Sequence, residues 1–370
     1  VKCVDVDIEV YIISLDRVES VLGEFGKVCR LGRSYGILRI NSLNLDISSP
    51  RLETKTGPGH KNFQVDLHSS LDFKSAFKRR DLTINAIGYD PLSGKIYDYY
   101  GGIADLNDRV LKATDKESFC EDPLRVLRVM QFAARLQMKP DKSLIELCSK
   151  LPLEQLPGER IFQEFKKLLL LSDKPSIGLQ FLCDCDQLKF FPELSLMPKT
   201  EQDAEKHPEG DLFNHTKLVV DNATSFRKDD LSYDEPMMFA ALCHDMGKPY
   251  VTTVTDNNRI ISHGHEQAGV KPATMFLKRM RCSNKLIEQV CFLVANHRVP
   301  IEFVRQGAKK SAYVRLKKKL DAHGLNFTIM ADISRSDKLG RSLPGTYREL
   351  TYEIDNFEKI AIEYCANDKN

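Results

Sequence analysis

The hydrophobic pattern changes character about a third of the way along this chain of 370 residues. Before about residue 112, short segments alternate apolar and polar side chains, as in residues 4–10 (VDVDIEV) and 36–48 (GILRINSLNLDIS). A period of two is typical of half-buried strands. Beyond this point the apolar spacing becomes helical, as in residues 122–136 and 158–171. The sequence therefore predicts an α+β fold, in which a strand-rich part is followed by helices.

A polar, proline-bearing stretch at residues 195–211 separates two helical regions, and most of the histidines follow it. Such stretches are typical of linkers and long loops. We therefore predict a strand-rich head (1–112), a helical neck (113–200), an all-α domain (201–345) and a C-terminal helix or tail (346–370).

Composition excludes several classes of protein. The longest uninterrupted aliphatic run covers residues 168–171, which is far too short to cross a bilayer, so no membrane partner is expected. The ten cysteines show no zinc-site spacing, which favours a reduced, cytoplasmic protein. The net charge of +2 gives no global signal for nucleic acid, but residues 305–320 carry seven Lys or Arg and no acid. That segment is either a phosphate-binding surface or a solvated helix face. The oligomeric state is left open.

Two acidic residues lie on one face of the first predicted strand. Asp5 and Asp7 are two residues apart, so their carboxylates are neighbours. Like charges this close repel unless water or a cation separates them. The face is therefore either a solvated edge or part of a metal site. With Asp46 on a later strand as a third carboxylate, the set could hold two Mg²⁺ ions for phosphoryl transfer.

The order of three motifs identifies a family. D-x-D at residues 5–7 is followed by R-R-D-x-T-x-N-A at 79–86 and by E-D-P-x-R-x-x-R at 121–128. Together with the loop at 55–63 and the helix at 159–169, they resemble the bacterial tRNA nucleotidyltransferase and poly(A) polymerase family. The resemblance implies a polymerase-beta-like head built on a mixed sheet. The resemblance covers roughly residues 1–175.

The resemblance implies roles for individual residues. Asp5 and Asp7 would bind Mg²⁺, with Asp46 as our inferred third catalytic carboxylate. The nucleotide would be bound by Arg80, Asp81, Asn85, Asp122, Arg125 and Arg128. Where the family often has a further Arg, three residues after Arg128, this chain has Gln131, which removes one interaction with phosphate.

Asp122 and Arg125 suit the pairing edges of cytosine and adenine. Both bases offer an amino donor beside a ring-nitrogen acceptor, which a carboxylate and a guanidinium complement. Guanine and uracil present a protonated ring nitrogen and a carbonyl instead. The pair would therefore select C and A without a template. The alternative is an ordinary salt bridge between residues i and i+3 of one helix.

Histidines and aspartates recur through the all-α domain in a fixed order. They resemble the ligand pattern of HD-domain phosphohydrolases over about residues 210–340. The resemblance implies one metal site made by His215, His244, Asp245 and Asp337, and a possible second metal held by His263, His265 and His297. Such ligands suit a transition metal such as Ni, Mn or Fe, and a metal-activated water would attack a phosphoester. His207 and His323 have no role in this pattern.

The leading hypothesis is template-independent addition of C and A to tRNA 3′ ends, using CTP, ATP and two Mg²⁺ ions. The neck and residues 305–320 would hold the tRNA, and the HD domain would act on 2′,3′-cyclic phosphates. One alternative within the family is a poly(A) polymerase or an A-adding or CC-adding variant. An alternative of another class is an HD phosphohydrolase whose degenerate head only binds RNA.

The start of the chain generates one further expectation. Members of the family carry a Gly-Gly-x-x-x-Arg stretch before the D-x-D strand, and this chain begins four residues before Asp5. We therefore expect an N-terminal truncation of roughly 20–35 residues, the size of a short strand plus a helix. The truncated chain would bind NTP poorly, whereas its HD domain would be unaffected.

Overall fold

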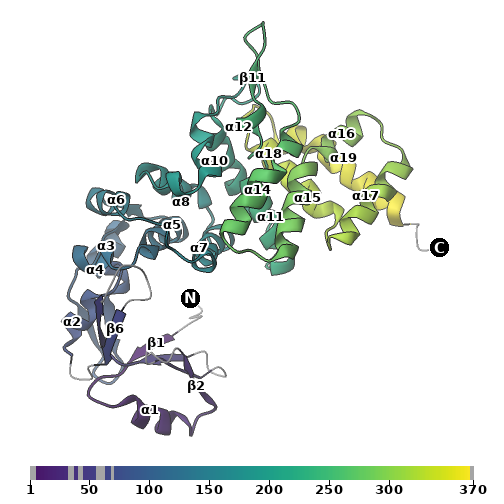
Figure 1. Ribbon diagram of the computed structural model, residues 1–370. Coiled ribbons are helices and arrows are strands. Elements are labelled where there is room, and N and C mark those ends of the chain that lie inside the picture. The colour runs from purple at the N-terminus through teal and green to yellow at the C-terminus, as the bar shows by residue number, and fades with distance from the viewer. Residues whose placement is uncertain (1–5, 32–36, 41–44, 56–62, 68–70, 367–370) are drawn as a thin grey trace. The chain divides into compact units, whose positions relative to one another are not determined.

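The computed structural model describes residues 6–31, 37–40, 45–55, 63–67 and 71–366 (Figure 1). The chain divides into two compact units, Val1–Arg125 and Val126–Asn370. The division falls inside α5 (Leu124–Leu136). None of the helices described in the structure is both long enough and apolar enough to cross a membrane.

The first unit contains a four-stranded mixed sheet in the order β1-β4-β3-β2. Its strands are β1 (Val6–Glu9), β2 (Val28–Leu31), β3 (Ile37–Ile40) and β4 (Leu45–Ser48). β1 pairs with β4 in parallel, and the other two pairings are antiparallel. Val18 of α1 (Leu15–Leu22) packs with Leu38 and Ile47 to form the core on one face of this sheet.

Two hairpins and several short helices complete the first unit. The hairpins are β5 (Arg51–Lys55) with β6 (Phe63–Leu67) and β7 (Ile87–Asp90) with β8 (Lys95–Asp98). The remaining elements are α2 (Phe73–Lys78), η2 (Thr83–Asn85), α3 (Gly102–Asp108), β9 (Val110–Leu111) and α4 (Lys116–Cys120). The side chain of Asp72 caps α2 by accepting a hydrogen bond from the Ser75 amide at 3.0 Å, which satisfies one of the free N–H groups at this helix end.

The predicted strands at residues 4–10 and 36–48 are confirmed by β1, β3 and β4. The alternation along β1 nevertheless predicts its burial poorly. Ile8, on the apolar side, is 38% exposed, whereas the side chain of Glu9 is only 9% exposed. The reason is that Arg79 and Arg80 cover Glu9, as described below. Asp5 lies outside the described residues.

The second unit is built from helices. They are α6 (Lys142–Ser149), α7 (Gly158–Leu171), α8 (Pro175–Asp184), α9 (Pro192–Ser195), α10 (Leu212–Ala223), α11 (Leu231–Cys243), α12 (Lys248–Val251), α13 (His265–Ala268), α14 (Val270–Arg279), α15 (Asn284–Asn296), α16 (Val299–Arg305), α17 (Lys310–Ala322), α18 (Phe327–Leu339) and α19 (Tyr347–Ala366). Short 3-10 turns occur at Leu188–Phe190, Met197–Lys199 and Thr224–Phe226. The short strands are β10 (Lys139–Pro140), β11 (Thr253–Val254) and β12 (Ile260–Ile261), and β11 and β12 form a hairpin within the region predicted to be all-α.

The central helix of this unit is α11. All residues from Met237 to Cys243 are buried, so the helix is covered on every side, as expected for a helix that is apolar all round. α10, α15 and α18 pack against it (Figure 1). The ends of these helices consequently meet in the interior of the unit, which is where the candidate metal ligands lie.

The aromatic core around α7 yields a stability prediction. Phe165 is fully buried and packs edge-on against Phe191 and Phe276, with ring centroids 5.2 and 5.6 Å apart. Phe165→Ala should lower the free energy of unfolding by about 3–5 kcal/mol, because it leaves a cavity. Leu171 lies on the same helix and is 57% exposed, so Leu171→Ala should change it by less than about 0.5 kcal/mol. Urea unfolding followed by circular dichroism checks this, and equal midpoints for the two variants would contradict it.

Candidate functional site

A group of buried acids and imidazoles gathers where helices of the second unit end. His215 lies on α10, His244 and Asp245 follow directly after α11, and Asp337 lies near the end of α18. The Nε2 atom of His215 is 3.3 Å from Nε2 of His244 and 3.2 Å from Oδ1 of Asp337. Nε2 of His244 is 3.1 Å from Oδ2 of Asp245. The structure thus brings together all four predicted ligands of the first metal.

The second oxygen of Asp245 faces two further histidines. Oδ1 lies 3.1 Å from Nε2 of His265 and 3.8 Å from Nε2 of His297. This oxygen is buried and accepts no hydrogen bond from any group that the structure describes. The carboxylate of Asp245 therefore has one oxygen toward each group of histidines. We name these six residues the histidine–aspartate cluster: His215, His244, Asp245, His265, His297 and Asp337.

The ring nitrogens of the cluster are arranged as metal ligands require. The Nδ1 atoms of His244, His265 and His297 lie 2.7–2.9 Å from the backbone carbonyl three residues earlier in each case. A neutral imidazole that donates from Nδ1 has a free lone pair on Nε2, and the Nε2 atoms are the ones that converge. Imidazole nitrogens and carboxylate oxygens are ligands that transition metals accept. The Oδ1 atom of Asp245, which accepts no hydrogen bond from the described residues, is therefore suited to bind such a metal.

Two cations that sequence reasoning missed neutralise the buried carboxylates. Nζ of Lys248 is 2.7 Å from Oδ2 of Asp245, and Nη2 of Arg341 is 2.7 Å from Oδ2 of Asp337. The available signal was their spacing, three residues after Asp245 and four after Asp337, which places each cation beside its acid on a helical turn. Burial raises the pKa of Asp245, but His244 and Lys248 outweigh it and hold that pKa well below its usual range.

Burial and neighbouring charges together keep Asp245 and Asp337 charged and His297 neutral. Burial raises the pKa of Asp337, but Arg341 and His215 outweigh it, so its pKa is well below the usual range. Burial lowers the pKa of His297 to about 4. A neutral imidazole is the form that binds a metal. For His265, burial lowers the pKa but Asp245 outweighs it, and the net shift of the pKa is upward.

The cluster leaves out one predicted ligand and has a neighbour that was not predicted. His263 is exposed, and none of the groups of potential metal ligands among the described residues includes it. His207, in contrast, is buried and lies with Glu209 beside His215. Burial raises the pKa of Glu209, but hydrogen bonds from the two histidines outweigh it and lower that pKa to about 2. Glu209 therefore stays charged.

Gly247 allows two short helices to meet at the cluster. A Cβ atom at this position would lie 2.0 Å from the carbonyl oxygen of His265 and 2.5 Å from the amide nitrogen of Gly269. Both contacts are to backbone, so a side chain here would force α12 and α13 apart. The absence of a side chain at Gly247 thus helps to bring Asp245 and His265 together.

In the first unit, two of the predicted carboxylate positions lie side by side on the sheet. Asp7 on β1 is in register with Asp46 on β4. The Asp46 side chain is half-buried and accepts a hydrogen bond at 2.5 Å from Nε of Arg39, which is its cross-strand neighbour on β3. The positions suit a Mg²⁺ site, since this ion prefers carboxylates together with substrate phosphates.

The R-R-D segment is anchored to β1 by an acid that the sequence pattern did not single out. Glu9 accepts a hydrogen bond from Nη2 of Arg79 at 2.6 Å and one from the hydroxyl of Tyr11 at 3.0 Å. Nη2 of Arg80 lies 3.5 Å from the same carboxylate. Glu9 is two residues after Asp7, so β1 carries both a candidate metal ligand and the partner of the arginines.

Asp81 and Asn85, predicted to contact the nucleotide, are bonded to each other. Oδ1 of Asp81 accepts hydrogen bonds from the Asn85 side-chain amide and from the Leu82 amide, both at 2.9 Å. Asp81 is buried. These hydrogen bonds close the R-R-D turn, and contact with the nucleotide stays a prediction for both residues.

Of the predicted base-reading residues, Asp122 lies just before α5 and Arg125 is in its first turn. Oδ1 of Asp122 accepts a hydrogen bond from the Leu124 amide at 3.0 Å. The guanidinium of Arg125 donates to the carbonyl oxygens of Ser118 and Arg79, both at 2.5 Å. Arg125 is thus held in place by the main chain of its own unit.

Two positions farther along α5 belong to the second unit. The guanidinium of Arg128 lies 5.2 Å from the centroid of the Phe132 ring. Gln131, which stands where the family often has Arg, is buried and accepts a hydrogen bond from Arg135 at 2.9 Å.

Comparison with known families and proteins agrees with the motifs. The model of the poly A polymerase head domain matches residues 4–112, the probable RNA- and SrmB-binding site of polymerase A matches 142–197, and the HD domain matches 212–323. The "Multifunctional CCA protein" of Mannheimia succiniciproducens is 33% identical over 79% of this chain and 70% of its own length. That of Methylobacillus flagellatus is 35% identical over 79% of this chain and 69% of its own. That of Pasteurella multocida is 35% identical over 68% of this chain and 60% of its own length.

Solved structures share the fold. A tRNA nucleotidyltransferase complexed with a primer tRNA and an ATP analogue has a TM-score of 0.63 at 20% identity, covering 98% of this chain and 91% of its own. The Thermotoga maritima CCA-adding enzyme complexed with tRNA has a TM-score of 0.59 at 19% identity, covering 100% and 76%. The predicted α+β fold is confirmed, although the chain spans only about 60–70% of the length of the curated relatives. The chain belongs to the family of CCA-adding tRNA nucleotidyltransferases and poly(A) polymerases, and it carries the head, the RNA-binding segment and the HD domain of that family.

Proposed function

We propose that the protein adds C and A nucleotides to the 3′ ends of tRNA without a template, using CTP and ATP. The observation that carries the proposal is the parallel register of Asp7 with Asp46 in a sheet whose first strand also anchors the R-R-D segment through Glu9. Relatives named as multifunctional CCA proteins support it, as do neighbours in fold that were solved with ATP, with CTP and with tRNA.

In this proposal Asp5, Asp7 and Asp46 hold Mg²⁺. Metal bound there would favour ionisation of the tRNA 3′-hydroxyl and offset the charge of the triphosphate during in-line displacement of pyrophosphate. Arg80, Asp81 and Asn85 contact the nucleotide, and the hydrogen bond between Asn85 and Asp81 holds the turn that presents them. Arg128 provides a further cation for the phosphates.

Asp122 and Arg125 select the base. The carboxylate accepts from the exocyclic amino group of C or A, and the guanidinium donates to the ring nitrogen. A guanidinium has five N–H donors, so the two carbonyls that hold Arg125 leave others for the base. A poly(A) polymerase or an A-adding or CC-adding variant would use the same residues, and incubation of tRNA lacking its 3′ end with each NTP separates these possibilities.

The head site is tested by removing one charge at a time from the protein. Asp7→Asn or Asp46→Asn should slow nucleotide addition by about 10³-fold, because metal stabilisation of the transition state is worth several kcal/mol. Asp108→Asn is the control, since Asp108 is an exposed acid of α3. Extension of radiolabelled tRNA measures the rate, and addition at the wild-type rate by Asp7→Asn would refute the assignment.

The HD domain is proposed to be a metal-dependent phosphohydrolase acting on 2′,3′-cyclic phosphates. His215, His244, Asp245 and Asp337 would hold the first metal, which would be Ni, Mn or Fe and would activate a water molecule. His265 and His297 would hold a second metal together with Asp245. His263, predicted as a third histidine of this second site, is exposed and is proposed to lie outside the ligands. An HD phosphohydrolase with a degenerate, RNA-binding head is the alternative of another class.

Asp245→Asn tests the HD proposal, because Asp245 contacts both groups of histidines. The variant should lose bound transition metal, measured by plasma mass spectrometry, together with hydrolysis of 2′,3′-cyclic AMP. Asp256→Asn, in the exposed turn between β11 and β12, should change neither. Wild-type protein that retains no metal after exposure to Ni²⁺, Mn²⁺ and Fe²⁺ would end this proposal while leaving that for the head intact.

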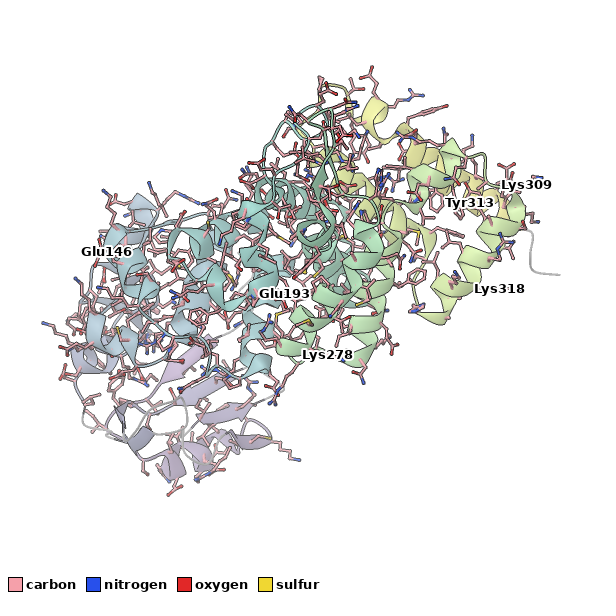
Figure 2. All side chains as sticks on the ribbon, turned by 45° about the horizontal axis from the view of Figure 1, so that its top comes forward. Glu146, Glu193, Lys278, Lys309, Tyr313 and Lys318 are labelled. Carbon is pink, nitrogen blue, oxygen red and sulfur yellow. The ribbon has the colours of Figure 1, made fainter. Side chains whose placement is uncertain are left out.

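The proposed RNA partner has a candidate surface on α17. Arg315, Lys318 and Lys319 are exposed at i, i+3 and i+4 spacing, and no ion pair involves them within the described ranges. The opposite face of the helix buries Tyr313, and Lys309 precedes its first turn (Figure 2). Like charges at this spacing repel in the free protein. Phosphates of tRNA would relieve that repulsion.

Salt dependence separates an RNA-binding face from a solvated one. For the triple variant Arg315→Gln, Lys318→Gln and Lys319→Gln, tRNA affinity should depend less steeply on salt. The magnitude of the slope of log affinity against log salt should fall by about 0.7–0.9 for each phosphate that is no longer neutralised. A control triple exchange to Gln alters exposed lysines elsewhere in the unit, namely Lys206, Lys271 and Lys285. Filter binding at several salt concentrations provides both slopes. Equal slopes for the two triples would make the α17 face a solvated one.

The location proposed for the protein is the cytoplasm. None of the cysteines that the structure describes forms a disulfide with another described residue, and four of them are buried; thiols persist in reducing compartments.

A further inference from the structure

The four histidines of the histidine–aspartate cluster differ in what holds their Nδ1 atoms. For His244, His265 and His297 the partner is a main-chain carbonyl, namely that of Ala241, Ser262 or Val294. For His215 the partner is a side chain, because its Nδ1 lies 2.8 Å from Oε1 of Glu209. The backbone therefore orients three of the rings, whereas the orientation of His215 depends on the side chain of Glu209, which a substitution can remove.

The protonation of His215 matters more than that of an isolated histidine. Its Nε2 lies 3.2 Å from Oδ1 of Asp337 and 3.5 Å from Oδ2 of Asp245. Either carboxylate would accept a hydrogen bond from Nε2 if the ring carried its proton there. The lone pair that binds a metal would then be lost. A charged acceptor at Nδ1 favours the other tautomer, in which Nδ1 carries the proton and Nε2 is free.

Glu209 is placed for this contact by its own loop. Nδ1 of His207 also lies 2.9 Å from Oε1 of Glu209, so two imidazoles contact the same carboxylate oxygen. Gly210 follows with φ of +102°, in a region that favours glycine, and Asp211 then caps α10 through the amide of Asn214. The turn thus folds Glu209 back onto the helix that carries His215. The Glu209 side chain is only 2% exposed, which limits competition from water.

We propose that Glu209 is a positioning residue of the HD site: its carboxylate fixes His215 in the tautomer whose Nε2 binds metal, and His207 fixes Glu209. The inference rests on the proposed metal-dependent function of the HD domain. It assigns a role to a histidine and a glutamate that lie outside the ligand pattern of the sequence.

Two substitutions separate the charge of Glu209 from its hydrogen bond. Glu209→Ala removes both, and Glu209→Gln keeps an acceptor without charge. Ni²⁺ binding to the full chain, measured by calorimetry, should weaken about 10–100-fold in the alanine variant, which is the usual cost of losing a partner of a ligating histidine. The glutamine variant should bind Ni²⁺ with intermediate affinity. Glu201→Ala, an exposed acid nearby in the chain, should bind like wild type.

The tautomer is read by ¹⁵N NMR of labelled histidine rings in the metal-free chain, with His215→Gln to assign the signal. The pH must be high enough for the ring to be neutral, because burial lowers the pKa of His215 but Asp337 and Glu209 outweigh it and raise that pKa. The His215 proton should be on Nδ1 in wild type and should move to Nε2 in Glu209→Ala, while circular dichroism stays unchanged. An unchanged tautomer in the alanine variant overturns the inference, and so does unchanged Ni²⁺ affinity. If wild type binds no metal, the hydrolase proposal fails, yet the NMR comparison still decides whether Glu209 sets the tautomer.

Discussion

Two carboxylates that lie in the interior of the second unit, Asp245 and Asp337, impose a constraint on everything around them. A buried charge without a partner costs several kcal/mol, so each acid must be met by positive charge or by donors. Lys248 meets the first and Arg341 the second, each from the turn that follows its acid. The helices that carry these groups end beside one another because α11 is buried on all sides and its neighbours must pack around it.

The first unit meets a smaller version of the same constraint. Glu9 is nearly buried on β1, and Arg79, Arg80 and the hydroxyl of Tyr11 surround its carboxylate. Burial of the acid is possible only because the R-R-D segment returns to the sheet from about seventy residues away. Pairing of buried charge thus links segments that are distant in the chain, and in both units the linked segments are those that carry the proposed chemistry.

The sequence predicted the parts of the fold that depend on local pattern. Helical spacing located α7, and alternation located β1 and β4. The order of His215, His244 and Asp337 suggested one site, and the structure brings them together. Charge pairing across long separations was not predictable: Glu9 sits on a face that alternation assigns to solvent, although its side chain is only 9% exposed.

The histidine-rich segment shows why residue type alone is insufficient. His263 and His265 are two residues apart, but Gly264 between them has φ of +74° and His265 begins α13, so only His265 turns inward. His207 had no partner in the sequence pattern. Its contact is Glu209, which reaches His215 only because the intervening glycine turns the chain back. A local backbone angle, which hydrophobic periodicity does not report, decides which histidines join the site.

One residue, Arg79, links the proposed parts of the nucleotide site in the head. Its side chain pairs with Glu9, two residues beyond Asp7, and its carbonyl accepts a hydrogen bond from Arg125. Selection of a base without a template depends on donors and acceptors held by the protein, since no complementary strand provides them. Such selection requires the base-reading group to stay at a fixed position relative to the metal-binding strand, because a displacement of about 1 Å costs about 10²-fold in rate. Because Arg79 contacts both Glu9 of β1 and Arg125, it helps to hold the base-reading residue at a fixed distance from the metal-binding strand.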